Sequence, residues 1–269
     1  MKNEFVLITG ATSGIGKSLA YNFAKYYKYN VFLLARNEKN LSQLASYLEK
    51  NFQINCCFLS VDLTQNDSIN EIKEFIINSK IDISILVNNA AMMSNSMNFI
   101  ESSDIYIKNT INLNITNLTK LTYELIDFFI KRGSGKILNV SSVIGFYSVP
   151  QSSIYGASKS YLISFSEALR NEIAEKNIQV SCLCPGATKS KSSKLFDFEK
   201  VNNIKLKKKF TFSFAGIMDP DIVAKYAIRK FFKNKAIIIP GIMNKLITYI
   251  MIIIGPLGRK LLISFRKLI

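Results

Sequence analysis

The sequence predicts an α/β fold with one doubly wound parallel sheet of about seven strands and a C-terminal helical extension. Short apolar runs recur along the chain, and segments with helical periodicity lie between them. Strands that are apolar throughout and alternate with helices indicate a parallel sheet covered on both faces. The expected strands are residues 5–9, 30–34, 55–61, 83–88, 136–140, 179–184 and 236–239.

The intervening segments have the periodicity of helices that bury one face. In 38–50, Leu41, Leu44 and Leu48 fall on one side of a helix, and 67–77 has a similar apolar stripe. No linker rich in Pro, Gly or Ser divides the 269 residues, and no repeat of solenoid length occurs. We therefore predict one catalytic domain over 1–240, followed by a basic and apolar helical extension over 241–269.

Composition limits the chemistry. Hydrophobic residues make up 48% of the chain, which is enough for a large core, and histidine is absent. The commonest general acid/base and the commonest metal ligand are therefore missing, so proton transfer falls to Tyr, Lys, Asp, Glu or Cys and no metal is expected. The four cysteines lie in apolar strand-like runs without metal-ligand spacing, which predicts buried thiols. The first residues lead directly into a strand without a signal peptide, which favours the cytoplasm.

The net charge of +16 lies mainly in the last third of the chain, since residues 225–269 hold ten basic and no acidic side chains. A biased base composition of the coding sequence would make Lys, Asn and Ile frequent, but it would spread lysine evenly along the chain. It therefore does not explain why the excess positive charge is confined to the last third. Residues 246–258 carry no charge but are too few for the roughly 20 residues that span a bilayer. Three alternatives stay open for 242–269: packing on the domain, packing on a partner subunit, or contact with an anionic membrane surface. No nucleic-acid partner is predicted.

A glycine-rich loop, TGATSGIG at 9–16, follows the first expected strand and precedes a helix. In this setting Gly10 permits a tight turn, Gly14 lets the backbone approach a ligand, and Gly16 lets helix and strand pack closely. The free N–H groups of the helix N-terminus would receive a pyrophosphate, as in Rossmann-like folds. The expected cofactor-binding residues of this loop are Gly10, Ser13, Gly14, Ile15 and Gly16.

The end of the second strand favours NADP(H) over NAD(H). An NAD site places a carboxylate here for the ribose 2′-hydroxyl, whereas this chain has Ala35 and Arg36, with no carboxylate before Glu38. A guanidinium suits the additional 2′-phosphate because its donors form a fixed fork. The alternative is a solvated arginine at the start of a helix.

A third group of residues can carry acid/base chemistry. Tyr155 and Lys159 are four residues apart, so both leave one face if the segment is helical. A nearby ammonium would lower the pKa of the tyrosine from its ordinary value near 10 toward a useful range. Ser142 follows an apolar strand and can donate a hydrogen bond to a substrate oxygen.

Six motifs along the chain combine in a characteristic order: TGATSGIG, Asn88-Asn89-Ala90-Ala91, Asn114, Ser141-Ser142, Tyr155 with Lys159, and Pro185-Gly186. Together these motifs resemble the short-chain dehydrogenase/reductase family, over about residues 4–240. One small departure is Ala91, where that family usually has glycine. Within the family the chain looks most like NADP-dependent reductases, a group that includes acyl-chain and ketosteroid-type enzymes.

The resemblance implies four catalytic residues. Tyr155 matches the catalytic acid/base and Ser142 the hydroxyl that orients the substrate. Lys159 matches the lysine that binds the nicotinamide ribose and lowers the pKa of the tyrosine, and Asn114 the asparagine that holds a proton-relay water. It also implies cofactor contacts at the adenine, the adenosine ribose and the nicotinamide, namely Asp62 with Leu63, Asn88 with Ala90, and Pro185, Gly186 and Thr188.

The function expected from the sequence is hydride transfer between NADP(H) and a carbonyl/alcohol pair. Residues 187–218 are lysine-rich and contain apolar side chains, which suits a lipid-like or acyl-chain ketone, free or bound to a carrier; these are Leu195, Phe196, Phe198, Phe210, Phe212 and Phe214. The alternative is a non-catalytic dinucleotide sensor or a membrane-interface scaffold on the same fold. The resemblance also implies a homodimer or homotetramer paired through 112–131 and 153–175.

Overall fold

The computed structural model describes residues 4–93, 98–189 and 216–256. Its centre is a seven-stranded sheet in the order β3-β2-β1-β4-β5-β6-β7, and every neighbouring pair is parallel. The predicted fold class is therefore confirmed, and each strand begins and ends within one residue of its expected bounds. The strands are β1 Glu4–Thr9, β2 Asn30–Ala35, β3 Cys56–Ser60, β4 Asp82–Asn88, β5 Gly135–Val140, β6 Ile178–Leu183 and β7 Ile237–Ile238.

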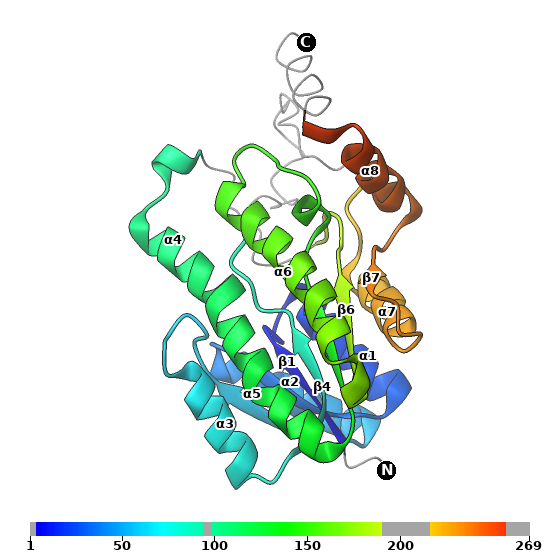
Figure 1. Ribbon diagram of the computed structural model, residues 1–269. Coiled ribbons are helices and arrows are strands. Elements are labelled where there is room, and N and C mark those ends of the chain that lie inside the picture. Colours follow the sequence, from blue (N-terminus) through cyan, green and yellow to red (C-terminus); the bar gives the residue numbers. More distant parts are fainter. Residues whose placement is uncertain (1–3, 94–97, 190–215, 257–269) are drawn as a thin grey trace, which may run out of the picture.

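Helices cover both faces of the sheet (Figure 1). One layer consists of α1 Gly14–Tyr27, α2 Glu38–Phe52 and α7 Pro220–Phe231. The other consists of α3 Ser68–Asn78, α5 Asn117–Arg132 and α6 Ser153–Glu172. The remaining helices are α4 Asp104–Ile111 and α8 Ile242–Ile253, with a π-helical turn Asn112–Thr116 and short 3-10 turns Phe99–Glu101, Val143–Gly145 and Ala174–Lys176.

The strands are apolar throughout because successive side chains enter different cores. Val6 and Ile8 of β1 pack with the layer of α1, α2 and α7, whereas Leu7 packs with the opposite layer. In β2, Leu33 packs with the layer of α1, α2 and α7, and Phe32 packs with the opposite layer. This is the two-sided burial expected of a parallel sheet.

The strand order places a crevice at the carboxyl ends of β1 and β4. The chain runs outward from β1 to β2 and β3 on one side, then returns to β4 on the other. Ligands of doubly wound sheets bind at this switch point. The loops after β1 and β4 are 9–16 and 88–91, which hold the first two sequence motifs.

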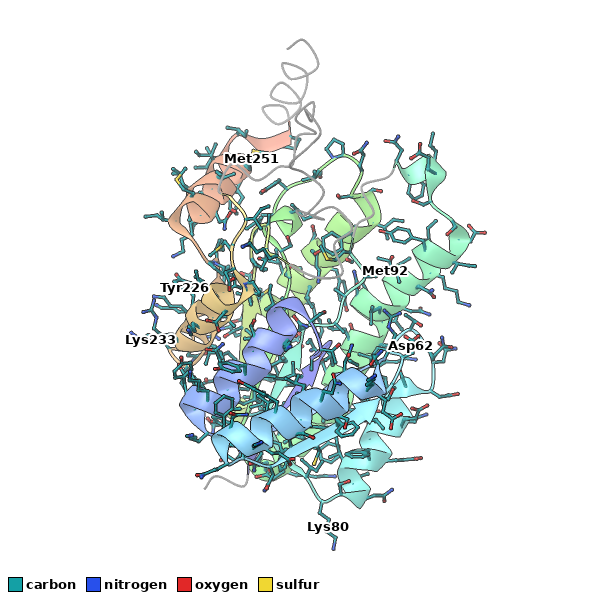
Figure 2. The ribbon with its side chains drawn as sticks, turned by 180° about the vertical axis from the view of Figure 1, so that it is seen from behind. Asp62, Lys80, Met92, Tyr226, Lys233 and Met251 are labelled. Atoms are coloured by element: carbon teal, nitrogen blue, oxygen red, sulfur yellow. The ribbon has the colours of Figure 1, made fainter. Side chains whose placement is uncertain are left out.

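The extension packs on the domain through one side of α8. Asn244, Thr248 and Met251 are buried, and Met251 joins a small apolar cluster with Cys184 and Ile239. In Figure 2, α8 with Met251 lies above α7, on which Tyr226 is labelled. Packing on the domain, one of the three alternatives for this segment, therefore describes this side of the helix.

The structure bears on the predictions made for the cysteines, the substrate segment and the C-terminal extension. Cys182 and Cys184 are buried as expected, but Cys56 and Cys57 are only partly buried, because β3 is the edge strand. The apolar residues expected to recognise the substrate, from Leu195 to Phe214, lie outside the described residues, as does the end of the extension. No helix within the described ranges is long and apolar enough to cross a membrane.

Candidate active site

The glycine loop is held in a conformation that only glycine tolerates at two positions. Gly10 has φ +66°, a left-handed conformation that is strained for other residues. A Cβ on Gly16 would lie within 3.0 Å of both the Gly10 carbonyl oxygen and the Asn89 amide nitrogen, closer than real Cβ atoms approach. Helix and strand are therefore in the close contact that the sequence predicts for Gly16.

The N-terminus of α1 is open to an anion. Ser13 is its extended N-cap residue, its hydroxyl makes no capping hydrogen bond, and the first turn has no acidic side chain. Gly14, the first helical residue, has φ +50°. Free N–H groups and the positive end of the helix dipole fit a dinucleotide pyrophosphate.

Two polar side chains that the sequence analysis did not single out fix this loop against β4. The Thr9 hydroxyl accepts hydrogen bonds from the backbone N–H groups of Asn89 and Ala90, each at 2.9 Å. The Asn89 amide in turn donates to the carbonyl oxygens of Thr9 (2.9 Å) and Gly10 (3.2 Å). A signal was available, because Asn89 directly follows the strand that borders β1 across the switch point.

The adenine end of the expected site combines an exposed cation with an ordered carboxylate. Arg36 is exposed at the end of β2, and its carbonyl oxygen accepts from the Ser60 hydroxyl at 3.1 Å. Asp62 accepts from the backbone N–H and the hydroxyl of Thr64, both at 3.0 Å, which orients its carboxylate. A narrow cavity of about 10 Å³ brings together three of the expected cofactor residues, since its lining includes Leu63, Asn88 and Ala90.

The side chain of Asn88 faces the protein interior. Its amide nitrogen donates to the Thr122 hydroxyl of α5 at 2.9 Å and to the Asn139 side-chain oxygen of β5 at 2.8 Å. Asn139 continues the network by donating to Ser166 of α6 at 2.9 Å. The Asn88 side chain thus joins sheet and helices, and only the backbone of this residue is available for the predicted cofactor contact.

Tyr155 and Lys159 share one face of α6, as their spacing predicts. The Lys159 Nζ lies 5.5 Å from the centroid of the Tyr155 ring. The lysine is buried, and its ammonium donates to the Val140 carbonyl oxygen at 2.9 Å. The Ser142 hydroxyl interacts with Tyr155, while its other contacts, to the Pro185 carbonyl oxygen and the Ile144 N–H, are long at 3.5 and 3.4 Å.

Asn114 is tied to the same helix through Ser158, another residue that the sequence analysis missed. The Asn114 amide donates to the Ser158 hydroxyl at 3.0 Å, and that hydroxyl donates to the Tyr155 carbonyl oxygen at 2.7 Å. Asn114 lies in the π-helical turn and also exchanges hydrogen bonds with the backbone of Met92, at 2.9 and 3.1 Å. All four expected catalytic residues therefore meet at one end of α6.

The electrostatics of the pair differ from the sequence-based expectation. Burial raises the pKa of Tyr155 to about 12, and the hydrogen bond from Ser142 only partly offsets this. Burial also lowers the pKa of Lys159 to about 8. The predicted lowering of the tyrosine pKa by Lys159 is wrong for this state of the site, because desolvation of the phenolate outweighs any help from the ammonium.

The lowered pKa of Lys159 predicts a pH-dependent stability. Between about pH 8 and 10.5 the unfolded chain binds the lysine proton and the folded chain releases it, so the free energy of unfolding rises with pH. We expect urea unfolding to show this rise in the wild type relative to Lys159→Met. The measurement stays below pH 10, above which the raised pKa of Tyr155 acts in the opposite sense. The same dependence in Lys159→Met would contradict the prediction, and Lys131→Met, at an exposed position, is the control.

The segment after β6 borders the same site. The Pro185 carbonyl oxygen accepts from the Val143 N–H at 3.1 Å, and the Thr188 hydroxyl donates to the Gly186 carbonyl oxygen at 3.0 Å. The side chain of Asn244, on α8, lies directly against Gly186, so that a Cβ there would overlap it. The Asn244 amide donates to the Pro240 carbonyl oxygen at 2.9 Å.

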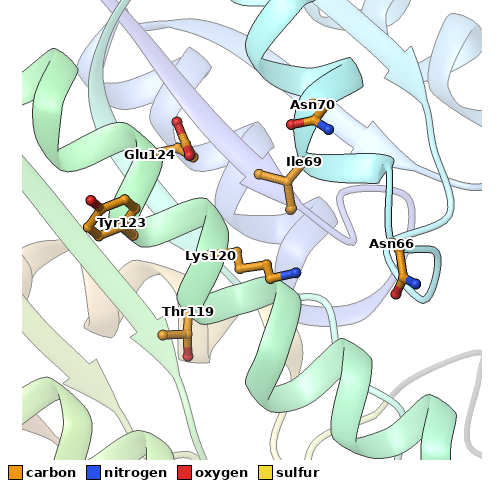
Figure 3. Close-up of a pocket in the computed structure, with 7 residues that line it drawn as sticks. All are labelled: Asn66, Ile69, Asn70, Thr119, Lys120, Tyr123 and Glu124. Atoms are coloured by element: carbon orange, nitrogen blue, oxygen red, sulfur yellow. The ribbon is translucent and has the colours of Figure 1, made fainter.

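A larger cavity, of about 440 Å³, opens between α3 and α5 and is separate from this site (Figure 3). Its lining contains none of the expected catalytic or cofactor residues, so we do not assign the reaction to it. The lining residues are Asn66, Ile69, Asn70, Thr119, Lys120, Tyr123 and Glu124.

Comparison with known proteins agrees with this arrangement. The profile of the short chain dehydrogenase family matches residues 4–199, which is most of the chain. The chain belongs to the short-chain dehydrogenase family. The matched range includes the glycine loop and all four expected catalytic residues.

Relatives within the family are about one third identical to the chain over the aligned residues. It is 33% identical over 195 residues to a very-long-chain 3-oxoacyl-CoA reductase from Macaca fascicularis, covering 71% of this chain and 62% of that protein. It is 30% identical over 207 residues to an NADP-dependent 3-hydroxy acid dehydrogenase from Schizosaccharomyces pombe, covering 76% and 80%. The chain thus spans less than two thirds of the length of the 3-oxoacyl-CoA reductase it matches.

A solved relative has the same fold. The short-chain dehydrogenase from Sphingobium yanoikuyae, in complex with NADPH, aligns with a TM-score of 0.78 and 29% sequence identity. The alignment covers 89% of this chain and 88% of that one. The Rossmann-like architecture is therefore that of a dinucleotide-binding short-chain dehydrogenase.

Proposed function

We propose that the chain is an NADP(H)-dependent oxidoreductase that interconverts a carbonyl and an alcohol on a lipid-like or acyl-chain substrate. The observation that carries the proposal is the convergence of Ser142, Tyr155 and Lys159 at the carboxyl edge of the sheet, where the glycine loop also lies. A sensor or scaffold needs the loop but not a serine, a tyrosine and a buried lysine grouped at one helix end. The names of the relatives, with their 3-oxoacyl and 3-hydroxy acid substrates, support this substrate class.

Each residue has a chemical role in the proposed reaction. When bound, a nicotinamide dinucleotide supplies or accepts the hydride. Ser142 donates a hydrogen bond to the substrate oxygen in place of its contact with Tyr155, and its other contacts are long. Tyr155, with a pKa of about 12, is protonated at neutral pH and can give its proton to that oxygen. This is the protonation state that carbonyl reduction requires of the proton donor.

Two further residues would prepare and renew the proton donor. Lys159 is oriented by the Val140 carbonyl oxygen, so its ammonium is fixed 5.5 Å from the ring centroid of Tyr155, where it would meet the nicotinamide ribose. Asn114 orders the first turn of α6 through Ser158 and would hold the water that returns a proton. The expected cofactor contacts of Asp62, Leu63, Ala90, Pro185 and Thr188 belong to this proposal as well.

The direct test is consumption of NADPH by the purified chain against a panel of carbonyl compounds. We expect turnover with 3-oxoacyl thioesters or bulky steroid- or retinoid-like ketones, and little with sugars or small polyols. Preference for small neutral sugars would contradict the substrate class. NADPH binding without turnover of any carbonyl compound would favour the sensor.

The choice of cofactor is tested at Arg36. We expect Arg36→Ala to raise KM for NADPH by about 10- to 100-fold, because charge-assisted hydrogen bonds to a phosphate contribute about 1.5–3 kcal/mol. KM for NADH, which has no 2′-phosphate, should change little. Lys39→Ala removes another exposed cation near the start of α2 and is the control. An equal rise in KM for both cofactors would contradict the assignment.

Self-association through 112–131 and 153–175 is also proposed. Large apolar side chains are exposed on the adjoining helices, with Ile105 of α4 at 73% and Tyr123 of α5 at 71%. Such residues are common at subunit interfaces. Sedimentation analysis should give a dimer or a tetramer, and a monomer at micromolar concentration would contradict this.

We place the enzyme in the cytoplasm, at a membrane surface.

A further inference from the structure

The helix α8 buries two polar residues beside Met251 and leaves most of its apolar residues exposed. Its buried positions include Asn244 and Thr248, with the Thr248 hydroxyl donating to the Asn244 carbonyl oxygen at 2.7 Å. A helix on the surface of a water-soluble protein normally has the reverse arrangement. The exposed side is almost wholly apolar, and its members are Ile242, Met243, Leu246, Tyr249, Ile250, Ile252 and Ile253.

The exposure of these side chains is large. Ile242 and Ile253, at the two ends of the helix, are each 82% exposed, and Tyr249 and Leu246 between them are 58% and 52% exposed. Isolated exposed apolar residues are ordinary, but a contiguous apolar surface along a whole helix marks an interaction site. We call the surface formed by all seven exposed residues listed above the apolar face of α8.

A cluster of cations borders α8. Arg229 and Lys230 of α7 and Lys245 of α8 lie 5.6, 5.7 and 5.9 Å from the ring centroid of Tyr226. No acidic residue follows Asp221 in the sequence, so nothing later in the chain neutralises them. Three cations around one ring repel each other, and a bound anionic group would relieve that repulsion. We call these four residues the Tyr226 cation cluster.

The combination of surfaces selects the partner. An apolar helical face beside a group of cations fits the boundary between the headgroups and acyl chains of an anionic bilayer. A symmetric contact with a second copy of the chain would instead bring two Tyr226 cation clusters toward each other, because both subunits use the same patch. The charge therefore favours the bilayer over self-association at this surface.

The surface adjoins the proposed active site. Asn244, on the buried side of α8, lies against Gly186, and its amide nitrogen is 3.3 Å from the Met218 sulfur. Met218 pairs with Thr188, so the backbone on both sides of residues 190–215 meets at α8. Docking through α8 would bring this end of the site close to the bilayer.

We propose that the apolar face of α8 and the Tyr226 cation cluster dock the enzyme on anionic phospholipid membranes. Docking would turn the segment after β6, at the edge of the proposed active site, toward the bilayer. The docking step stands independently of catalysis. The delivery of a lipid-like substrate from the bilayer rests on the proposed function. The two parts are tested by separate measurements.

Docking is tested by co-sedimentation of the full chain with vesicles of phosphatidylcholine, with and without phosphatidylserine. We expect binding to the anionic vesicles and much less to the neutral ones. Two variants remove the two components: Leu246→Gln/Tyr249→Gln/Ile253→Gln and Arg229→Gln/Lys230→Gln/Lys245→Gln. The cation variant should bind anionic vesicles about 100-fold more weakly, since each basic residue near such a surface contributes about fivefold.

Matched controls change the same residue types elsewhere. Ile77→Gln/Tyr47→Gln and Lys39→Gln/Lys50→Gln/Lys131→Gln replace exposed residues on other helices and should bind as the wild type does. Failure of the wild type to sediment with anionic vesicles overturns the proposal. Unchanged binding by both the apolar variant and the cation variant also overturns it. A fall in molecular mass in the apolar variant, with vesicle binding unchanged, would instead assign the face to a second copy.

Delivery is read from activity. The apolar variant and the cation variant should both retain wild-type turnover of a water-soluble carbonyl substrate without vesicles. Both should be slower than wild type when a lipid-like carbonyl is supplied in anionic vesicles. Equal rates on the vesicle-borne substrate would overturn the delivery step while leaving docking in place. Absence of any NADPH-dependent turnover would contradict the proposed function, and the sedimentation result would still decide the docking step.

Discussion

Tyr155→Phe is expected to lower kcat for carbonyl reduction by about 10²- to 10⁴-fold, the usual contribution of a positioned general acid. The substitution removes only the phenolic hydroxyl, which is the proton source, and leaves the ring that packs beside Lys159. NADPH binding and the free energy of unfolding should stay close to wild type. Stopped-flow measurement of a single turnover would separate the chemical step from product release.

The control for this substitution lies on the same helix. Tyr161 also has its hydroxyl in a hydrogen bond, with the Thr119 hydroxyl at 2.9 Å, but it is not part of the site. Tyr161→Phe should therefore retain most activity. If Tyr155→Phe kept more than about a tenth of the wild-type kcat, the assignment of the proton donor would be wrong.

Gly16→Ala should both destabilise the chain and weaken cofactor binding. The added methyl group would overlap the Gly10 carbonyl oxygen, so the backbone of the loop or the start of α1 must move. Overpacking of this kind costs about 1–3 kcal/mol. The displaced loop would also lose backbone hydrogen bonds to the pyrophosphate, and we expect the Kd of NADPH to rise about tenfold or more.

Gly156→Ala is the matched substitution for stability. Gly156 lies in α6, and the nearest atom to an added Cβ is the Ile144 carbonyl oxygen at 3.9 Å. Alanine is the better helix former by about 1 kcal/mol, so the variant should unfold at equal or higher urea concentration than wild type. A Gly16→Ala chain as stable as wild type, with wild-type NADPH affinity, would contradict the close contact between loop and helix.

The fold could be predicted from the sequence because its signal is local and repeated. Residues such as Leu7 and Phe32 are apolar for the same reason as their neighbours, namely that each strand is buried from both sides. An apolar run therefore marks a strand without knowledge of the rest of the chain. Even β7, which has only two residues at the sheet edge, lies within one residue of its expected bounds.

The residues of the site could be predicted where short spacing defines them, and their environment could not. Tyr155 and Lys159 share a helix face, which their separation by four positions already indicates. Whether Lys159 or burial dominates the pKa of the tyrosine depends on side chains from distant parts of the chain. The same holds for Asn88, whose side chain joins β4 to residues 34 and 51 positions away.

The contact between Gly186 and Asn244 has a consequence for exchanging parts between enzymes. Because the amide fills the space that any side chain at 186 would need, the two positions are constrained to vary together. A chimera that receives a foreign C-terminal tail must receive a compatible residue at 186 with it, or the segment beside the cofactor site will be displaced. The segment after β6 and the helix α8 are thus coupled, and one cannot be exchanged without the other.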